Sequence, residues 1–483
     1  MTIGTLNRVH AAPCWPSSDN PPPTNGPTGD VEFSYNPQDQ VTMQPSTTTV
    51  HGVGQGPSVE KAAVRSDSPA PKDDKYVYEQ SDSRYHTANA FAATAKTIEI
   101  FEQALGQSFD WAFRGSQLKV NGDKGDMLNA YYSRNDGSIN FFHSRDSVFN
   151  RTVYSGDSGE VVSHEAGHAI LDGLRPGYLS SFSPDPGGFH ESFGDVLAML
   201  VSLKDDRVLD KVIEQTGGDL SRPNVAAHLG EELGMAINHY TGGNATGGDY
   251  TRTAINNFKW QDPSTLPSRA PHDQLSREVH SYSRLWTGAF YDVFKGINEA
   301  YQAQGKSPKE ALAAAADEGL HIYGSLMKTA PSGNFAYRDM AQALLRADAQ
   351  FNDGKRSDLI RDVMVERRIL PQSFEMAELD SANPTGELRE LQTTLKGDQF
   401  GQFEGAVVRT QIDSVADIAG DSGREAKLQA DVKQLIDDGR ILYTTPGQSV
   451  AQSDLFDKEG NPYIGVVRWE SGQMEIERVK VLA

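Results

Sequence analysis

The residues with the clearest chemical potential form the segment His164-Glu165-Ala166-Gly167-His168. On a helix, side chains four positions apart lie on one face, so both imidazoles could bind one metal ion. Glu165 lies beside them, where a carboxylate can take a proton from water activated by that metal. The pattern H-E-x-x-H therefore predicts a metal site with a general base next to it.

The segment around this motif has the features of a helix. Asp157 and Glu160 have the spacing of a capping box, and Gly173 and Pro176 fall where such a helix would end. One side of the segment is apolar and would face the core; its residues are Val161, Val162, Ala166, Ala169 and Ile170.

A second apolar-periodic segment begins near residue 189 and carries Glu191 and Asp195 one helical turn apart. This spacing lets Glu191 be a third ligand while Asp195 bonds the outer ring nitrogen of a ligand histidine. Two histidines and one glutamate leave a fourth position for water, which is the pattern of catalytic zinc. His190 is the competing ligand, but adjacent helical residues point about 100° apart, and the spacing to Asp195 favours Glu191.

Together these residues resemble the thermolysin-like (gluzincin) zinc endopeptidases, which pair H-E-x-x-H with a Glu-x-x-x-Asp helix. The longer metzincin motif is not present, because Leu174 stands where its third histidine would be. The resemblance covers roughly residues 80–370. It implies one catalytic Zn²⁺ held by His164, His168 and Glu191.

The resemblance implies further site residues outside the two zinc helices. His280, at the start of an apolar segment, matches the histidine that donates a hydrogen bond to the oxyanion. Tyr178 and Arg252 lie at spacings similar to those of a second oxyanion donor and of an arginine that bonds a substrate carbonyl. Packing of Tyr178 in a loop and a coincidental spacing of Arg252 are the alternative interpretations.

The partner that orients His280 is open. The family commonly has an aspartate a few residues earlier, but this chain has Leu275 there, with Asp273 and Glu278 nearby.

A calcium site is also left open. Glu160 stands where the family has an acidic calcium ligand, and Asp205 and Asp206 follow the second helix. Ser202, however, stands where another carboxylate would be expected. A favourable interaction of Glu160 with the helix dipole explains that residue equally well.

Composition limits the class of partner. The chain has 483 residues, is 37% hydrophobic and carries a formal net charge of −21. Such an acidic surface repels nucleic acid and anionic membranes, so neither is an expected partner. A peptide or protein substrate and a monomeric state are expected instead. The single cysteine, Cys14, excludes a disulfide within the chain.

The first 75 residues are rich in Pro, Ser, Thr, Gly and Asp, and few apolar residues recur at any period. This composition predicts a disordered tail. Residues 1–20 have no apolar core of a signal peptide and no segment has the length of a membrane span. The sequence as written therefore predicts a cytoplasmic location, with export by a non-standard route left open.

The order of elements predicts an α+β fold resembling the two-lobed zincins. A helix over 85–105 and strands over 117–120, 127–132 and 139–142 precede the zinc helix and predict a twisted-sheet lobe over residues 76–200. In the family, the edge strand of this sheet binds the peptide substrate, and the stretch around Asn140 resembles that strand. A structural hairpin is the alternative.

The rest of the chain divides into three parts. Helical patterns over residues 201–370 predict the all-helical lobe, residues 371–400 look like a linker, and 401–483 read as a small independent α+β domain without a chemical motif. The sequence thus predicts a zinc-dependent endopeptidase in which Glu165 is the general base. The alternatives are a zinc-bound, toxin-like module directed at one partner protein, and an inactive scaffold that keeps the fold.

Overall fold

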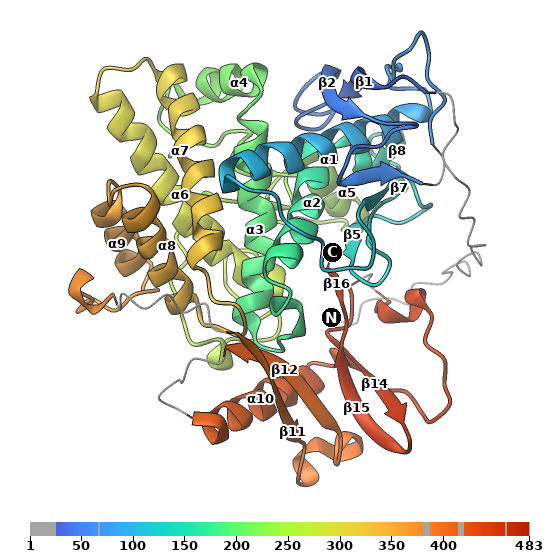
Figure 1. The fold of residues 1–483 in the computed structure, drawn as a ribbon, viewed down its shortest axis with the longest axis vertical. Coiled ribbons are helices and arrows are strands. Elements are labelled where there is room, and N and C mark those ends of the chain that lie inside the picture. The colour runs from blue at the N-terminus through green and yellow to red at the C-terminus, as the bar shows by residue number, and fades with distance from the viewer. Residues whose placement is uncertain (1–25, 66–67, 380–386, 414–419, 459–460, 483) are drawn as a thin grey trace.

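The computed structural model describes residues 26–65, 68–379, 387–413, 420–458 and 461–482 of the chain. These residues form an α+β fold in which helices pack beside several small sheets (Figure 1). The helices are α1 Arg84–Leu105, α2 Gly159–Leu174, α3 Pro184–Ser202, α4 Asp206–Thr216, α5 Glu231–Thr241, α6 Val279–Ala303, α7 Pro308–Thr329, α8 Tyr337–Phe351, α9 Ser357–Glu366 and α10 Gly420–Asp437. The first strands are β1 Gly29–Tyr35, β2 Ser46–Val53, β3 Ala62–Val64, β4 Leu118–Asn121, β5 Ala130–Ser133, β6 Ser138–Phe141, β7 His143–Asp146 and β8 Arg151–Tyr154. The later strands are β9 His228–Leu229, β10 Arg252–Thr253, β11 Leu388–Thr394, β12 Val407–Asp413, β13 Ile441–Leu442, β14 Gly465–Glu470, β15 Gln473–Arg478 and β16 Val481–Leu482.

The sheet next to the predicted zinc helix has the order β16-β5-β6-β4-β3. Strands β5 and β6 form an antiparallel hairpin, and β4 runs parallel to both β6 and β3. The hydroxyl of Tyr132 on β5 donates to Asp172 on α2 at 2.7 Å, and Arg134 binds the same carboxylate. This buried ion pair fixes β5 alongside α2.

Helices α1, α2, α3, α6 and α7 bury their apolar faces in one continuous core. Aromatic contacts connect them; the rings of Phe193 on α3 and Tyr323 on α7 stack with centroids 5.0 Å apart. Phe101 of α1 meets the edge of the same Phe193 ring at 5.5 Å. The helix predicted over residues 85–105 is confirmed as α1, and α7 begins with a capping box formed by Ser307 and Glu310.

The prediction of a disordered tail over residues 1–75 is wrong for the part that the structure describes. Strands β1 and β2 pair with each other, and Val31, Phe33 and Tyr35 alternate inward into the core. Phe33 stacks on Tyr76 with ring centroids 4.7 Å apart. The outward positions of both strands are polar, so the segment has the composition of a tail although its inner face is apolar. Residues 1–25 lie outside the described residues.

The predicted linker and independent end domain also need correction. Strand β11 lies within residues 371–400 and belongs to a five-stranded sheet of order β11-β12-β15-β14-β13, packed against α10 (Figure 1). Strand β16 leaves this unit and pairs antiparallel with β5, with Val481 opposite Ser133 and Leu482 opposite Tyr132. The unit is therefore joined to the sheet beside α2 by main-chain hydrogen bonds.

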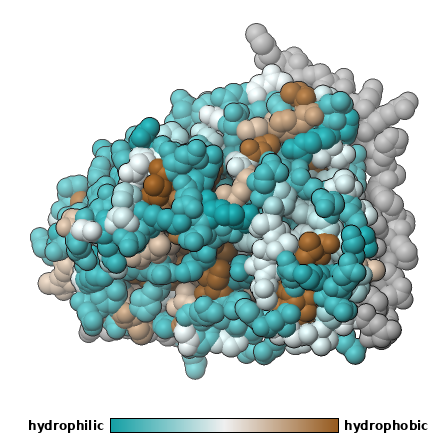
Figure 2. Space-filling model, turned by 90° about the horizontal axis from the view of Figure 1, so that it is seen from above, coloured by the Kyte–Doolittle hydropathy of each residue, from teal (hydrophilic) through white to brown (hydrophobic). Residues whose placement is uncertain are grey.

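Among the helices that the structure describes, none has the length and apolarity that crossing a bilayer requires. Figure 2 shows a mostly hydrophilic face with small, separate hydrophobic patches. The large apolar side chains that are exposed come from separate segments of the chain: Val41, Val148, Tyr240 and Phe351.

A cluster of buried carboxylates anchors the N-terminal segment to the start of α2. Glu160 accepts hydrogen bonds from the Gln38 side chain at 2.8 Å and from the Gly230 N–H at 3.3 Å. Asp39 accepts from the N–H of Glu232 at 2.7 Å. Burial raises the pKa of Glu160 and of Glu231 well above the usual value, and the nearby carboxylates raise both further. Both side chains therefore hold protons in the folded protein at pH values where the unfolded chain has lost them.

This cluster predicts that Glu231→Gln becomes increasingly favourable as pH rises. An unfolded glutamate ionises near pH 4.5. Above that pH, folding must take up a proton at Glu231, so wild-type stability falls by up to about 1.4 kcal/mol per pH unit until the folded pKa is reached. Urea denaturation at pH 5 and pH 8 should show the difference in free energy of unfolding, variant minus wild type, growing with pH. The exposed Glu99→Gln is the control; an equal growth in both variants would contradict the prediction.

Candidate metal centre

Four segments distant in sequence supply the side chains of the candidate site. Helix α2 carries His164, Glu165 and His168, and α3 carries Glu191 and its neighbours. Strand β10 and the first turn of α6 add one residue each. The first turn of α2 is capped by Ser158, whose side chain accepts from the N–H of Val161, so the cap lies one residue after the predicted Asp157.

Two glycines let the ligand-bearing helices approach closely. A Cβ at Gly167 on α2 would lie 3.0 Å from the Cα of Gly194 on α3. A Cβ at Gly194 would lie 2.6 Å from Nδ1 of His164. Any larger residue at either position would push α2 and α3 apart, so these glycines set the distance between the ligands from the two helices.

His164, His168 and Glu191 converge in the interior. One ligand atom from each lies within 4.8 Å of the others. Nε2 of His164 is 3.4 Å from one Glu191 oxygen, and Nε2 of His168 is 3.6 Å from the other. Two ligands that each lie about 2.0–2.1 Å from a zinc ion at the tetrahedral angle are about 3.3–3.4 Å apart. The spacing of the three side chains fits a single ion of that size.

The buried polar atoms of these side chains support the same interpretation. Nε2 of His168 and both carboxylate oxygens of Glu191 are buried without a hydrogen-bond partner. Such orphaned groups are costly unless something binds them, and a cation would satisfy all three at once. Burial alone would raise the pKa of Glu191, but His280, His168 and His164 lower it to about 2. Burial lowers the pKa of His168 well below its usual value. An anionic carboxylate and a neutral imidazole are the protonation states that metal binding requires. His164 differs, because burial would lower its pKa but Asp195 and Glu191 raise it to about 9, so a metal would displace a proton from that ring.

Asp195 and Arg252 lie behind His164. Asp195 is 2.9 Å from Nδ1 of His164, which leaves Nε2 of that ring facing Glu191. Arg252 on β10 donates to both oxygens of Asp195, at 2.8–3.1 Å. Burial would raise the pKa of Asp195, but Arg252 and His164 hold it far below its usual value. The sequence pattern that placed Asp195 behind a ligand histidine is therefore matched by the geometry.

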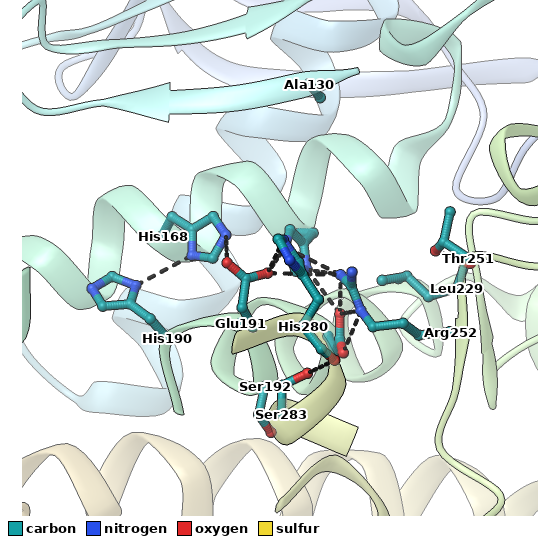
Figure 3. A network of polar contacts seen from close by, with 12 residues as sticks. Ala130, His168, His190, Glu191, Ser192, Leu229, Thr251, Arg252, His280 and Ser283 are labelled. Carbon is teal, nitrogen blue, oxygen red and sulfur yellow. Dashed lines mark hydrogen bonds and ion pairs between the residues drawn. The ribbon is translucent and has the colours of Figure 1, made fainter. Parts of the chain in front are cut away.

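His190 contacts His168, the second histidine of the candidate ligand set. Its Nδ1 lies 3.2 Å from Nδ1 of His168, and Figure 3 shows the two rings side by side with His168 turned toward Glu191. With a metal on Nε2 of His168, its Nδ1–H must donate to Nδ1 of His190. The predicted choice of Glu191 over His190 agrees with this arrangement, because His190 contacts a ligand rather than the ligand cluster.

Glu165 is almost fully buried, close enough to Glu191 and His280 to interact with their charges. Burial raises its pKa to about 8, with Glu191 adding to the rise and His164, Arg252 and His280 opposing it. A carboxyl group with this pKa can accept and release a proton near neutral pH.

His280 lies across from the ligands, at the start of α6 (Figure 3). Its Nε2 is 3.3 Å from Glu191, and its Nδ1 is 2.7 Å from Glu278. Burial would lower the pKa of His280, but Glu191 and Glu278 raise it to about 9. Glu278 is thus the orienting partner that the sequence left open. In the sequence, only its position directly before the predicted helix, two residues ahead of His280, indicated that Glu278 could have this role.

The predicted roles of Tyr178 and Asn140 are wrong. The Tyr178 ring is fully buried against Phe335, and its hydroxyl donates to the carbonyl of Pro331 at 2.6 Å, so it does not face the ligand cluster. Asn140 lies on β6, a central strand, where its side chain is fully buried and bonded to Asn121 and Ser138.

The strand beside α2 is β5 instead of β6, and in the sheet order β5 lies between β16 and β6. The carbonyl of Asn129 accepts from Ser155 just before α2, and Tyr132 bonds Asp172 near the end of α2. The backbone between these two anchors therefore runs past the turn that carries His164 and His168. Figure 3 shows Ala130 on this strand near the zinc helix. Strand β16 pairs only with the Tyr132–Ser133 part of β5.

No second group of three or more metal-binding side chains comes together among the residues that the structure describes. Glu160 instead bonds Gln38 and Gly230, and Ser202 bonds the carbonyl of Met199. Asp205 caps α4 through the N–H of Arg207.

No protein-family model matches this chain, and a search of curated proteins also finds no match.

The glycine contact predicts that Gly194→Ala loses the metal. The added methyl group would displace the His164 ring and separate it from Asp195 and Glu191. Elemental analysis of the purified wild type should give about one zinc per chain, and Gly194→Ala and His168→Ala should each retain well under half of that. Gly243→Ala, where a Cβ meets only open space, is the control. Full zinc content in Gly194→Ala would contradict the proposed ligand spacing.

Proposed function

We propose that this chain is a zinc-dependent endopeptidase of the thermolysin-like kind. The observation that carries the proposal is the buried cluster of His164, His168 and Glu191 with Glu165 and His280 beside it. The order of elements supports it as well: a helix, a small sheet, a helix with H-E-x-x-H, a helix with the third ligand, and a later helix that begins with His280. A zinc ion held there would polarise the scissile carbonyl and make water a stronger acid.

Glu165 is the proton carrier in this proposal. Its carboxylate takes a proton from the attacking water and passes it to the leaving amine. Burial raises the pKa of Glu165 above that of an exposed glutamate, so its carboxylate is a stronger base than usual. Because Glu165 is almost fully buried, bulk water does not compete for the proton during this step.

His280 stabilises negative charge on the carbonyl oxygen. With a pKa of about 9 it is an imidazolium at neutral pH, and Glu278 fixes its Nδ1–H so that Nε2–H points toward Glu191 and the ligand cluster. A charged donor held in position before the reaction lowers the energy of the transition state more than that of the substrate. Arg252, anchored on Asp195, provides a second fixed cation for a substrate carbonyl.

The peptide substrate would lie along β5. Among the described residues, Ala130 and Tyr131 are the part of β5 that does not pair with β16, and both are buried. A peptide there would replace the bond from the Ala130 N–H to Oδ1 of Asn129. A peptide that adds to this part of β5 uses main-chain hydrogen bonds, which tolerate many side chains. We therefore expect cleavage of extended peptides and unfolded proteins.

The first test separates an enzyme from a scaffold. Glu165→Gln keeps the size of the side chain but cannot accept the proton, so turnover of a fluorogenic peptide should fall by about two to four orders of magnitude. Zinc content should equal that of the wild type, and Glu99→Gln should cleave normally. If both the wild type and Glu165→Gln bind one partner protein and neither cleaves peptides, the scaffold alternative replaces the proposal.

The second test concerns His280 and Glu278. His280→Ala should keep zinc and lose about two to three orders of magnitude in kcat, as expected for a lost oxyanion donor. Glu278→Gln should lose less, because it only orients the ring. The double variant should resemble His280→Ala, since both changes act on one interaction. Additive losses would show that Glu278 acts independently of His280.

A further inference from the structure

A cavity of about 80 Å³ lies between the start of helices α3 and α6 and the C-terminal sheet unit. A cavity of this size has room for several water molecules, so it suits a small organic ligand of a few atoms, and ligand sites are common where two packed units meet. Part of its wall is apolar, from Phe182, Val279, Leu435 and Ile464. Glu278 and Val279 also line it, so the cavity begins beside the residue that precedes His280.

Arg478 is the unusual group in this wall. Its side chain is only 7% exposed, yet no carboxylate pairs with it among the described residues. Nε donates to the carbonyl of Ser181 at 2.9 Å, and Nη1 donates to the carbonyls of Ile464 and Val479 at 3.0 and 2.7 Å. These three bonds fix the guanidinium, while Nη2 has no hydrogen-bond partner in the part of the chain that the structure describes.

The other charges of the wall have partners. Arg277 bonds Asp438 at 2.7 Å, and Arg440 lies 3.5 Å from Asp457. Arg269 also has a polar or electrostatic partner. Of the carboxylates, Asp431 binds Lys427 and Glu278 binds His280. One positive charge, that of Arg478, is therefore left without a counter-charge.

The surroundings of Arg478 disfavour its cation. Burial, together with the neighbouring Arg440 and Arg134, lowers the pKa of Arg478 to about 10. A buried charge without a counter-ion is costly, and a carboxylate that accepts from Nη2 would supply that counter-ion. The protein supplies a rigid donor and a cavity but no anion.

We propose that this cavity binds a carboxylate attached to an apolar group, held by the guanidinium of Arg478. The carboxylate would accept from Nη2 and reach the polar side of the wall, while the apolar group would contact Val279, Leu435 and Ile464. Two sources have this chemistry. One is an acidic side chain of a peptide bound at the zinc site, which rests on the proposed function; the other is a free organic acid.

The test uses the full chain carrying Glu165→Gln, so that binding is measured without cleavage. Isothermal titration calorimetry should detect binding of hexanoate but not of hexanamide, which has the same shape without the charge. Adding Arg478→Gln should weaken hexanoate binding at least about tenfold, a change of about 1.4 kcal/mol. Arg468→Gln, half-exposed on β14, should bind hexanoate normally. Equal binding of acid and amide, or unchanged binding by a folded Arg478→Gln variant, would overturn the proposal.

If Arg478→Gln does not fold, a second variant tests whether hexanoate binds in this cavity. Leu435→Trp adds bulk to the cavity from α10, where Leu435 is half-buried, and leaves Arg478 in place. It should keep its zinc and lose hexanoate binding. Retained binding in this variant would place the ligand elsewhere and refute the cavity as its site.

Kinetics with the wild type distinguish the two sources. If hexanoate inhibits cleavage of a glutamate-containing peptide competitively and spares the matched glutamine peptide, the cavity binds a substrate side chain. If hexanoate binds without inhibiting either peptide, the ligand is a free organic acid. Calorimetry does not depend on turnover, so a chain that binds hexanoate but cleaves nothing would contradict the endopeptidase proposal and leave the carboxylate site intact.

Discussion

A completely buried, ionised carboxylate is the constraint on which the rest of the site depends. Glu191 has no exposed surface and no hydrogen-bond partner, and the positive charge nearest to it comes from His164, His280 and the more distant Arg252. Taking such a charge out of water is costly unless positive charge or a metal compensates it. The close approach of α2 and α3 at Gly167 and Gly194 provides the geometry for that compensation.

The sequence predicts those parts of the candidate site whose residues lie close together in the chain. The i, i+4 spacing of His164 and His168, and that of Glu191 and Asp195, follows from helix geometry alone. The helical periodicity around these residues also gave the correct element type for α1, α2 and α3. Gly167 and Gly194 stood in the same segments, but their role depends on how two helices pack, which no single helix pattern contains.

The contacts that the sequence did not reveal are those between distant segments. Whether Asn140 lies on an edge or a central strand depends on strand order, and local alternation of polar and apolar residues is the same in both cases. Tyr178 has nearly the sequence spacing expected of an oxyanion donor, but in the structure its ring packs against Phe335. That contact joins segments far apart in the chain, which spacing alone does not reveal. The composition of residues 29–53 predicts disorder because it averages the residues on both faces of β1 and β2. Only the residues on the inner face determine whether a strand packs against the core.

The pairing of β16 with β5 has a consequence for the order in which parts of the protein fold. Val481 pairs with Ser133, two residues that are 348 positions apart in the chain. Closing a loop of that size has a high entropic cost, so contacts between such distant strands form slowly. The ribosome also synthesises β16 long after β5. During synthesis, therefore, the helices that carry His164 and Glu191 can pack while the neighbouring sheet still has an unpaired edge. The arrival of β16 then covers the Tyr132–Ser133 part of that edge and joins the C-terminal unit to the sheet.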